Sequence, residues 1–442
     1  MSTIIPTGLR RETRFDLLAV AGVAALVVAA AVVGEHLKAG GTDIVLGFPP
    51  LLATWEPHVG PGTPAAVAVA VLVVTRGPAV AQRLAWRPLL LTGYGVSVLW
   101  TASLALVDGW SRGVVGRLTS IHEYLTDVPR VTDIPQMLQT FSEFILPGPD
   151  TWVTHVGAHP PGIFLFYVWL DRVGLGGGGP SGIVTLLLGA SAGVAVVVAL
   201  RALGEERTAR AVLPFAVLFP GAVWVGVSAD GLFAAALAWG TALVAVAAGG
   251  GARAAWAWAF AGGALLGWCL YLSYGLVLGG LLPLAVLAVT RDRTALLWSA
   301  AGVLAIGAAF TASGFWWFTG FERVQVIYAL SVAQSRPYTY FLWANLAALA
   351  IAVGPAVVAG LRRLAAAPRS LPLLAAVLVA GGLAAIVLAD VSGLSKAEVE
   401  RIWLPFGIWL VVACALLPRA RMWLAAQAGL ALAVNHLLFT VW

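Results

Sequence analysis

The residues best suited to chemistry gather in one polar interval of an otherwise apolar chain. This interval runs from Asp108 to Gly179 and directly follows an apolar run. It holds the following acids, histidines and tyrosine: Asp108, His122, Glu123, Tyr124, Asp127, Asp133, Glu143, Asp150, His155 and His159. Carboxylates and imidazoles are the side chains that most often move protons in enzymes. The sequence therefore predicts that any catalysis takes place here, at one face of a membrane.

Two aspartates stand out by their position. Asp108 lies where an apolar run meets the polar interval, and an ionisable group at the membrane surface is a candidate functional residue. Asp230 stands in a second turn, Ser228-Ala229-Asp230-Gly231, between two apolar runs. The plainer alternatives are a charge that merely ends a helix for Asp108 and an ordinary turn aspartate for Asp230.

The histidines lie near glutamate and proline residues. His122 and Glu123 are predicted to lie on an amphipathic surface helix, where a solvated face is the alternative to a function. His155 and His159 come just before Pro160 and Pro161. The two could bind a metal as a pair, but the sequence fixes no third ligand. We therefore assign no metal site, and a divalent metal remains open as a cofactor.

Two further segments supply cations. Lys396, Glu400 and Arg401 belong to the last polar loop, where we expect Arg401 to be an exposed cation facing a lipid phosphate. Arginine suits phosphate because its donors form a planar fork. Arg336 and Tyr338 form a second group of a cation beside aromatics. The alternatives are an ordinary charged loop for the first segment and an aromatic belt residue for the second.

Composition identifies the chain as a single membrane domain, residues 1–442. It is 60% hydrophobic and 10% charged, whereas a soluble domain carries roughly 25% charged residues. The net charge of +6 does not indicate nucleic-acid binding, because the basic residues are scattered at segment ends. Cys269 and Cys414 lie inside apolar runs, so a disulfide is not expected. The sequence contains no Walker motif and no serine or cysteine nucleophile motif.

An all-α polytopic protein with about 13 transmembrane helices is predicted from the apolar segments, since a span needs about 20 residues. The candidate segments are 15–34, 63–80, 88–107, 181–203, 211–228, 231–248, 254–273, 275–290, 295–314, 340–360, 371–390, 403–417 and 422–441. Pro160–Gly174 is too short to cross and carries Asp171 and Arg172. We predict that it is a juxtamembrane helix in the outer interface.

The distribution of basic residues predicts the orientation. With Arg10, Arg11 and Arg14 at a cytoplasmic N-terminus, most of the Lys and Arg residues fall in inner segments and most acids fall outside. The outer polar elements are then 35–62, 108–180, the Asp230 turn, 315–339 and 391–402. We therefore expect a multi-pass plasma-membrane protein with its active site on the outer, periplasmic face.

The order of these features resembles the GT-C glycosyltransferases. In that superfamily an acid follows a span at the start of the first large outer loop, the loop ends in a short helix containing Pro-Pro, and a second acid follows. Asp108, His159-Pro160-Pro161-Gly162 and Asp230 stand in the same order here. The resemblance implies a module at about 88–290 with an outer catalytic loop at 108–180. The helices of 295–442 would then bind the lipid donor.

A narrower resemblance points to the cell envelope of actinobacteria. The elements that carry it are Asp108-Gly109-Trp110, His122-Glu123-Tyr124-Leu125, Val128-Pro129, His155–Gly162 and Gly393–Phe406. They are most similar to methylthioxylosyltransferases that act on the mannose caps of lipoarabinomannan. The resemblance implies a polyprenyl-phosphate-linked sugar as donor and a cell-envelope glycan as acceptor, with membrane lipids as neighbours and no nucleic acid.

The resemblance also implies roles for residues in an inverting transfer. Asp108 would be the general base for the acceptor hydroxyl, with Glu123 and Asp230 as the competing candidates. The substrate-binding candidates are His122, Tyr124, His155, His159, Arg336, Tyr338, Lys396, Glu400 and Arg401. The rival hypothesis is a transporter or a flippase for lipid-linked sugars, which predicts inverted repeats, broken helices and charges at the membrane midplane.

Overall fold

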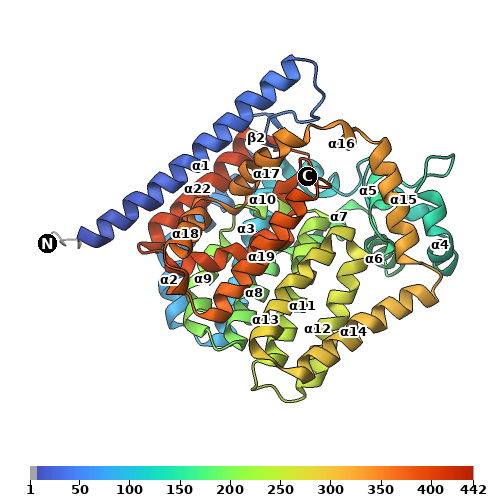
Figure 1. Cartoon of the computed structure of the whole chain (residues 1–442). Helices are drawn as coiled ribbons and strands as arrows, with labels where there is room; N and C mark the ends of the chain where they lie inside the picture. The colour runs from blue at the N-terminus through green and yellow to red at the C-terminus, as the bar shows by residue number, and fades with distance from the viewer. Residues whose placement is uncertain (1–6, 442) are drawn as a thin grey trace.

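The chain folds as an α-helical bundle with one small sheet (Figure 1). The computed structural model describes residues 7–441. In this part of the chain, eight helical stretches are long and apolar enough to cross a membrane. They are α1 (Thr7–Ala39), α2 (Thr63–Arg83), α3 (Trp86–Ala105), the α7–α8 stretch (Gly178–Gly189 and Ala192–Ala202), α11 (Ala229–Ala248), α12 (Ala255–Leu272), α14 (Arg293–Ala312) and α19 (Leu373–Val391). The prediction of an all-α polytopic membrane protein is confirmed.

The other predicted spans are helical but shorter or broken. The pair α17 (Tyr338–Val353) and α18 (Pro355–Ala366) is bent by 110° and would make a ninth span. The remaining segments are α9 (Glu206–Val217) with α10 (Ala222–Val225), η6 (Tyr274–Gly280) with α13 (Leu281–Thr290), α21 (Leu404–Gly407) with η8 (Ile408–Leu416), and α22 (Ala420–Leu437). Both η6 and η8 are 3₁₀ helices, which rise further per residue than an α-helix and so span more depth in fewer residues.

The polar interval folds into short helical turns rather than one long helix. These are η1 (Leu106–Asp108), η2 (Ser111–Val115), η3 (Tyr124–Thr126), η4 (Val128–Arg130), α4 (Ile134–Thr140), η5 (Phe141–Phe144), α5 (Thr154–Ala158) and α6 (Pro161–Arg172). The prediction of a surface helix at His122-Glu123 is wrong, because both residues precede η3 in a turn. Buried aromatic contacts hold these turns together, and the indole of Trp152 donates to the carbonyl of Phe141.

The helix α6 matches the predicted short helix after the two prolines. It has 12 residues, and Pro161 occupies its first turn, where a missing backbone donor costs nothing. Most of its residues are buried, and it packs against α12 through Gly162, where an added Cβ would come within 2.5 Å of the Tyr271 carbonyl. Its placement in the outer membrane interface remains a prediction.

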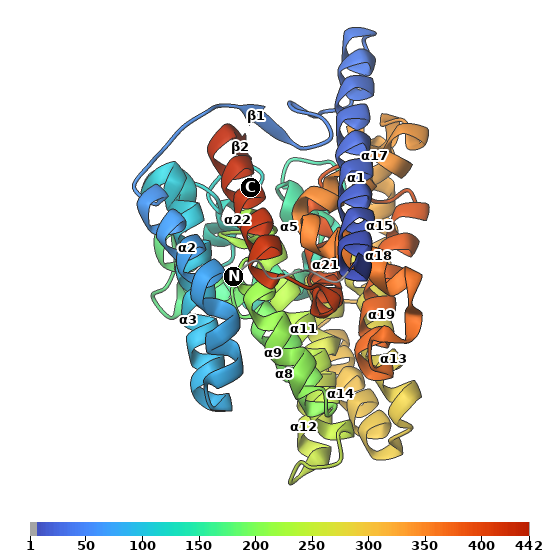
Figure 2. The ribbon, with the colours of Figure 1, turned by 90° about the vertical axis from the view of Figure 1, so that its left-hand side faces the viewer.

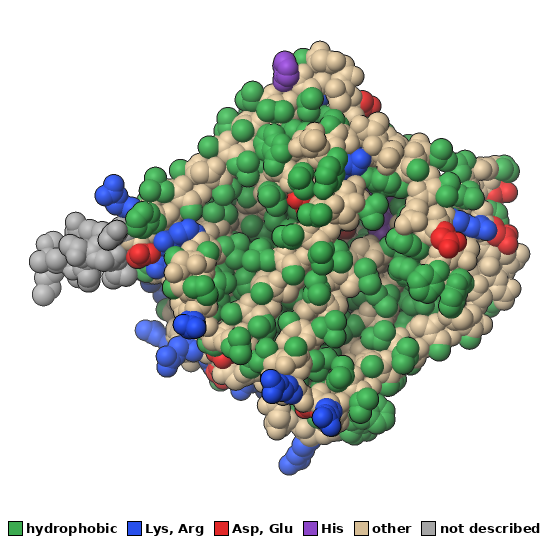
Figure 3. Space-filling model, in the orientation of Figure 1, with side chains coloured by type: hydrophobic (Ala, Val, Ile, Leu, Met, Phe, Trp, Pro, Cys, Tyr) green, Lys and Arg blue, Asp and Glu red, His purple; other side chains and the backbone are tan. Residues whose placement is uncertain are grey.

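The segments predicted to be outside lie at one end of the bundle. Figure 2 shows β1 (Ala53–Trp55), β2 (Leu438–Thr440) and α5 near the upper end, while the turn between α11 and α12 lies below. The two strands pair antiparallel, so the first polar segment joins the end of the chain. On the face seen in Figure 3, basic side chains gather along the lower left edge, away from this end.

Three further elements complete the end that carries the polar segments. They are α15 (Trp317–Leu330), α16 (Val332–Ser335) and α20 (Val399–Ile402). The short helix η7 (Pro368–Ser370) is not one of them and follows directly after α18. The helix α15 contacts both α5 and η5. The part of the polar interval around η5 and α5 is therefore packed against a helix from much later in the sequence.

A buried ion cluster joins α1 to α18. The carboxylate of Asp16, which is 0% exposed, accepts from the guanidinium groups of Arg362 and Arg363 at 2.5 and 2.6 Å. Glu12 also pairs with Arg362, at 2.8 Å, but is half-exposed. Because α1 buries little of its surface in the bundle, this cluster is an important anchor for it, together with the Tyr340 hydroxyl, which donates to the Ala30 carbonyl at 2.8 Å.

Substituting Asp16 with alanine should destabilise the protein strongly. Two arginines would lose their shared buried partner, and breaking a buried ion pair costs about 3–5 kcal/mol. The matched substitution Glu12→Ala removes a half-exposed pair and should cost less than about 1 kcal/mol. Thermal unfolding of the detergent-solubilised protein measures both, and equal effects of the two substitutions would contradict the proposed clamp.

Cysteine labelling tests the orientation. Ser120 in the polar interval and Arg253 in the α11–α12 turn are both exposed, and the native Cys269 and Cys414 are buried. A membrane-impermeant maleimide added to intact cells should label Ser120→Cys. It should label Arg253→Cys only after the cells are permeabilised. The opposite pattern would invert the predicted topology.

Candidate active site

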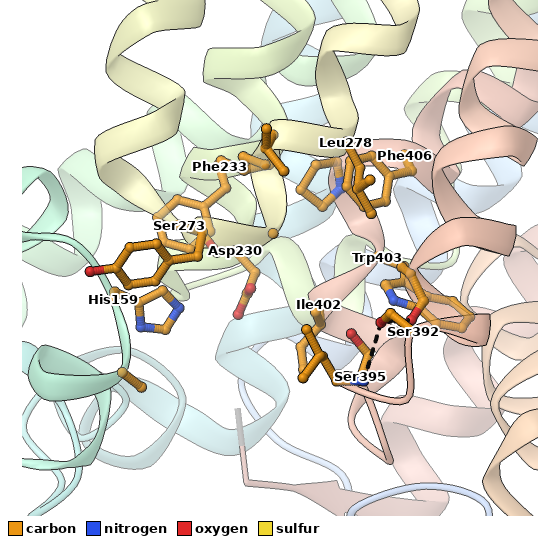
Figure 4. Close-up of a pocket in the computed structure, with 18 of the residues that line it drawn as sticks. His159, Asp230, Phe233, Ser273, Leu278, Ser392, Ser395, Ile402, Trp403 and Phe406 are labelled. Carbon is orange, nitrogen blue, oxygen red and sulfur yellow. Dashed lines mark hydrogen bonds between the residues drawn. The ribbon is translucent and has the colours of Figure 1, made fainter. Parts of the chain in front are cut away.

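A cavity of about 360 Å³ opens between the polar interval and the last helices of the chain. Its polar side chains include His159 after α5, Asp230 on α11 and Arg401 on α20. Figure 4 shows His159 and Asp230 at one side of the cavity. The remaining wall is mostly apolar and aromatic, with contributions from Phe233, Tyr274, Leu276, Val277, Leu278, Phe321, Val324, Tyr328, Leu388, Trp403 and Phe406. The cavity is thus lined by both the predicted module (88–290) and the predicted donor-binding helices (295–442).

Asp230 is placed by the start of α11. The hydroxyl of Ser228 caps the helix by accepting from the Gly231 N–H at 3.3 Å. The same turn packs closely against the preceding segment, since a Cβ on Gly231 would lie 2.5 Å from the Val225 carbonyl oxygen. A carboxylate in the first turn is stabilised by the unpaired N–H groups and the helix dipole. Asp230 is 5% exposed, and its carboxylate points into the cavity (Figure 4).

Arg401 bridges two carboxylates at the cavity wall. Its Nη1 donates to Asp230 Oδ2 at 2.6 Å and its Nη2 donates to Glu398 Oε2 at 2.7 Å. Burial opposes its charge, but the two carboxylates outweigh burial and raise the pKa of Arg401 above its ordinary value. The expectation of an exposed loop cation is wrong, because Arg401 is only 8% exposed. The helix α20, which carries Arg401, contacts α10, α11 and α17.

His159 faces the cavity as a neutral imidazole. Its Nδ1 lies 2.8 Å from the carbonyl oxygen of His155 and 3.2 Å from the hydroxyl of Tyr124. A carbonyl can only accept, so Nδ1 carries the proton and Nε2 is left as an acceptor. Burial, with a smaller effect of His155, lowers the pKa of His159 to about 4. His159 can therefore accept a proton or a hydrogen bond at neutral pH, but it does not supply a fixed positive charge.

Glu123 and His155 form a buried pair next to the cavity. His155 Nδ1 lies 2.7 Å from Glu123 Oε1, and both side chains are at most 10% exposed. The ring of Tyr124 packs beside both histidines, and burial raises its pKa well above the ordinary value. His122 lies outside this pair and contacts the hydroxyl of Thr154 at 3.1 Å. Neither Glu123 nor His155 is among the residues that line the cavity.

Asp108 belongs to a different cluster. Its carboxylate lies 2.9 Å from His58 Nε2, 3.1 Å from Arg112 Nη2 and 2.7 Å from Arg117 Nη2. The side chain is 7% exposed and does not line the cavity. Arg112 and Arg117 also lie over the ring of Phe439 in β2, so the cluster ties the end of the chain to η1. The role of Asp108 as the base remains a prediction.

The other predicted binding residues surround the loop that leads to Arg401. Arg336 and Lys396 are buried and contact each other's backbone carbonyls at 2.6 and 3.1 Å. Tyr338 is 40% exposed, and its hydroxyl donates to the Val391 carbonyl at 3.0 Å. Glu400 points away from the cavity, where it accepts from the Leu52 N–H at 3.2 Å. These four residues therefore position the loop rather than line the cavity.

Metal ligands do not cluster in residues 7–441. No group of three or more histidine, cysteine, aspartate or glutamate side chains in this range could hold an ion. Asp230, which lines the cavity, and Glu398 beside it are both paired with Arg401. A divalent ion at this point would have to compete with that guanidinium for its ligands.

Several residues at the site were not identified from the sequence. Glu398 was visible only as one charge of a charged loop, and its pairing with Arg401 depends on the turn before α20. Ser273 and Tyr274 lie inside an apolar run that is interrupted in the structure, where the α12 helix ends and η6 begins. The only signal for them was that this run is too long for one span and can be divided in more than one way.

Comparison with known proteins shows a distant structural likeness. No protein-family model matches the sequence, and no curated protein matches it. Among solved structures, the chain is similar to the crystal structure of ArnT from Cupriavidus metallidurans in the apo state, with a TM-score of 0.46 and 19% sequence identity. The similarity covers 74% of this chain and 59% of the ArnT chain, so the chain spans less than two thirds of that structure.

Glu400 should make stability depend on pH. Burial raises its pKa to about 7, whereas an unfolded glutamate has a pKa of about 4.3. The folded protein therefore binds more protons between these values, so its stability should fall as the pH rises from about 4.3 to about 7. Melting temperatures measured at pH 5 and pH 8 should show this decrease.

Gln at position 400 can still accept from Leu52 but cannot ionise. Glu400→Gln should therefore flatten the dependence of the melting temperature on pH. Glu143→Gln, which neutralises an exposed carboxylate of the polar interval, should leave the dependence unchanged. An identical pH profile for the native protein and Glu400→Gln would rule out Glu400 as the group responsible.

Proposed function

We propose that the chain is a membrane glycosyltransferase of the GT-C type that takes its sugar from a polyprenyl-phosphate donor. The cavity carries this proposal, because a carboxylate, a neutral imidazole and a buried guanidinium meet there beside an apolar wall. Ligand cavities of about 300–1,000 Å³ suit small molecules, and the volume of about 360 Å³ suits a sugar with its phosphate. The apolar and aromatic wall suits the first units of a polyprenyl chain.

The identity of the sugar and of the acceptor comes from the sequence resemblance. On that basis the sugar is a pentose such as methylthioxylose, and the acceptor is a cell-envelope glycan such as lipoarabinomannan. The site itself supports only the chemistry that these molecules share. It offers a proton acceptor for a hydroxyl group and a cation for a phosphate.

The proposed reaction is one direct displacement with inversion. The acceptor oxygen forms a bond to the anomeric carbon of the sugar while the bond from that carbon to the phosphate oxygen breaks. The acceptor proton passes to a carboxylate, and the lipid phosphate leaves with the bonding electrons. Arg401 would stabilise the charge that develops on the phosphate, which is worth most in a buried site. The neutral His159 would accept a hydrogen bond from a sugar hydroxyl.

Among the three candidate bases, we favour Asp230. Its Oδ2 is held by Arg401, and Oδ1 has no hydrogen-bond partner in the described part of the chain. A base must reach the hydroxyl within about 3 Å, and Asp230 is the one of the three that lines the cavity. Glu123 is bonded to His155 just outside it, and Asp108 is bonded to two arginines in the separate cluster.

The bend between α17 and α18 is the observation that favours the rival transporter or flippase hypothesis, since transporters use broken helices. Gly354 makes the break with a φ of +84°. The amide of Gln427 closes it by accepting from the Ala356 N–H and donating to the Val353 carbonyl at 3.2 and 2.9 Å. The break thus has satisfied backbone groups and a neutral partner, whereas an ion or substrate path would need open polar groups.

Asp230→Asn should abolish transfer without unfolding the protein. Asparagine keeps the size and an oxygen that can accept from Arg401, but it is not basic. Transfer should fall by about two to four orders of magnitude, the typical value of general base catalysis. The assay uses radiolabelled polyprenyl-phosphate pentose and lipoarabinomannan with the purified protein, and donor binding should be retained.

Two matched substitutions decide between the candidate bases. Under the proposal, Asp108→Asn and Glu123→Gln should keep more activity than Asp230→Asn. Loss of transfer in Asp108→Asn together with normal transfer in Asp230→Asn would return the role of the base to Asp108. Normal transfer by all three variants would replace the enzyme with the transporter.

A further inference from the structure

The loop before α20 brings buried cations together around one carboxylate. Glu398 lies between two guanidinium groups: its Oε2 accepts from Arg401 Nη2 at 2.7 Å, and its Oε1 lies 3.5 Å from Arg336 Nη2. Lys396 is 9% exposed, and its ammonium donates to the backbone carbonyls of Gln334 and Arg336. Two guanidinium groups therefore share the Glu398 carboxylate, Arg401 also pairs with Asp230, and the Lys396 ammonium adds a third buried cation without a carboxylate partner of its own.

The partners of Arg336 are incomplete. Its side chain is 7% exposed, and its Nε is buried without a hydrogen-bond partner in the described part of the chain. The contact to Glu398 is long for an arginine–carboxylate pair, which normally measures about 2.7–2.9 Å. A buried guanidinium with an unused donor and one long contact is better matched by an anion with more oxygen atoms.

The backbone that carries Glu398 is strained. Ala397 and Glu398 both have positive φ angles, of +75° and +61°, and neither is glycine. Such angles persist only where the surrounding structure holds them. Asn345 does this from α17, since its amide donates to Asp390 and to the Ser395 carbonyl, and its oxygen accepts from the Ala397 N–H. The loop is thus built to hold the Glu398 carboxylate between the two arginines.

This arrangement is next to the cavity. Arg401 lines the cavity, and so do Ser395 and Tyr328, whose ring lies 5.8 Å from the Lys396 ammonium. Glu398 and Arg336 do not line the cavity, and Glu398 is bonded to Arg401 from behind that wall. A lipid phosphate bound at Arg401 would reach Arg336 only by taking the place of the Glu398 carboxylate. Its oxygen atoms could replace both carboxylate contacts and also reach the unused donor of Arg336.

We propose that the space between Arg336 and Arg401 is a binding site for the phosphate of a phosphate ester, and that Glu398 competes with this phosphate for the two guanidinium groups. The inference rests on the proposed function and adds the phosphate site and a residue that controls access to it. A phosphodiester carries one negative charge, as Glu398 does, so the exchange keeps the charge of the buried site balanced.

The test measures binding of polyprenyl phosphate to the purified protein in detergent. Glu398→Gln removes the competing charge and should bind polyprenyl phosphate about tenfold more tightly. The reason is that the side chain at this position would occupy the two guanidinium groups in a smaller fraction of the protein molecules. Glu398→Asp keeps the charge but is shorter and cannot span both guanidiniums, so it should show a smaller gain. This second variant keeps the test valid if Glu398→Gln does not fold.

Glu56→Gln serves as the matched control. It neutralises another carboxylate that is paired with an arginine at the same end of the molecule, 2.6 Å from Arg112 and outside the cavity. It should bind polyprenyl phosphate as the native protein does. A gain in affinity as large as that of Glu398→Gln would mean that the effect comes only from the change in net charge, and it would overturn the proposal.

Inorganic phosphate provides the second probe. An equal gain in affinity for both probes in Glu398→Gln would mean that the site recognises only the phosphate group. A gain for polyprenyl phosphate but not for inorganic phosphate would mean that the protein also binds the lipid chain. Folded Glu398 variants with unchanged or weaker binding of both probes would overturn the proposal and leave the transferase intact. No binding of polyprenyl phosphate by the native protein or any variant would remove the proposed function itself.

Discussion

The structure of the site depends on keeping the charge of Arg401 inside a mostly apolar protein. An isolated buried guanidinium is costly, and it is tolerated only with close partners. Asp230 and Glu398 supply them at 2.6 and 2.7 Å. One carboxylate comes from the start of α11 and the other from the loop before α20, so a single cation ties the middle of the chain to its last quarter. The cavity lies beside this junction.

The same constraint explains why the neighbouring polar groups are bonded in pairs. Glu123 is bonded to His155, His159 to a backbone carbonyl, and Asn345 to Asp390 and the loop. In a medium with little water, an unsatisfied polar group costs more than in a soluble protein. Each pair fixes the direction of a side chain near the cavity. The site is therefore preorganised, and a charged ligand must exchange contacts rather than simply add them.

The two acidic clusters illustrate a division of roles within the outer end. Asp108 joins η1 to the C-terminal strand through Arg112 and Arg117, and it leaves no oxygen without a cation nearby. Asp230 is held by one oxygen and directs the rest of its carboxylate into the cavity. A carboxylate held on both sides is suited to structure, and one held on a single side is suited to accept a proton.

Hydrophobicity and the spacing of prolines were enough to predict the membrane class, the helical segments and α6, because the length of an apolar run directly reflects the thickness it must cross. The polar interval was also recognised from the sequence, with His159 among its candidate residues. Asp230 was a candidate in a later turn. The burial of Arg401 could not be predicted, since a charge in a short loop looks the same in sequence whether water or a carboxylate surrounds it. Its partners lie 3 and 171 residues away. Only the tertiary structure brings them together and decides that Asp230, rather than Asp108, faces the cavity.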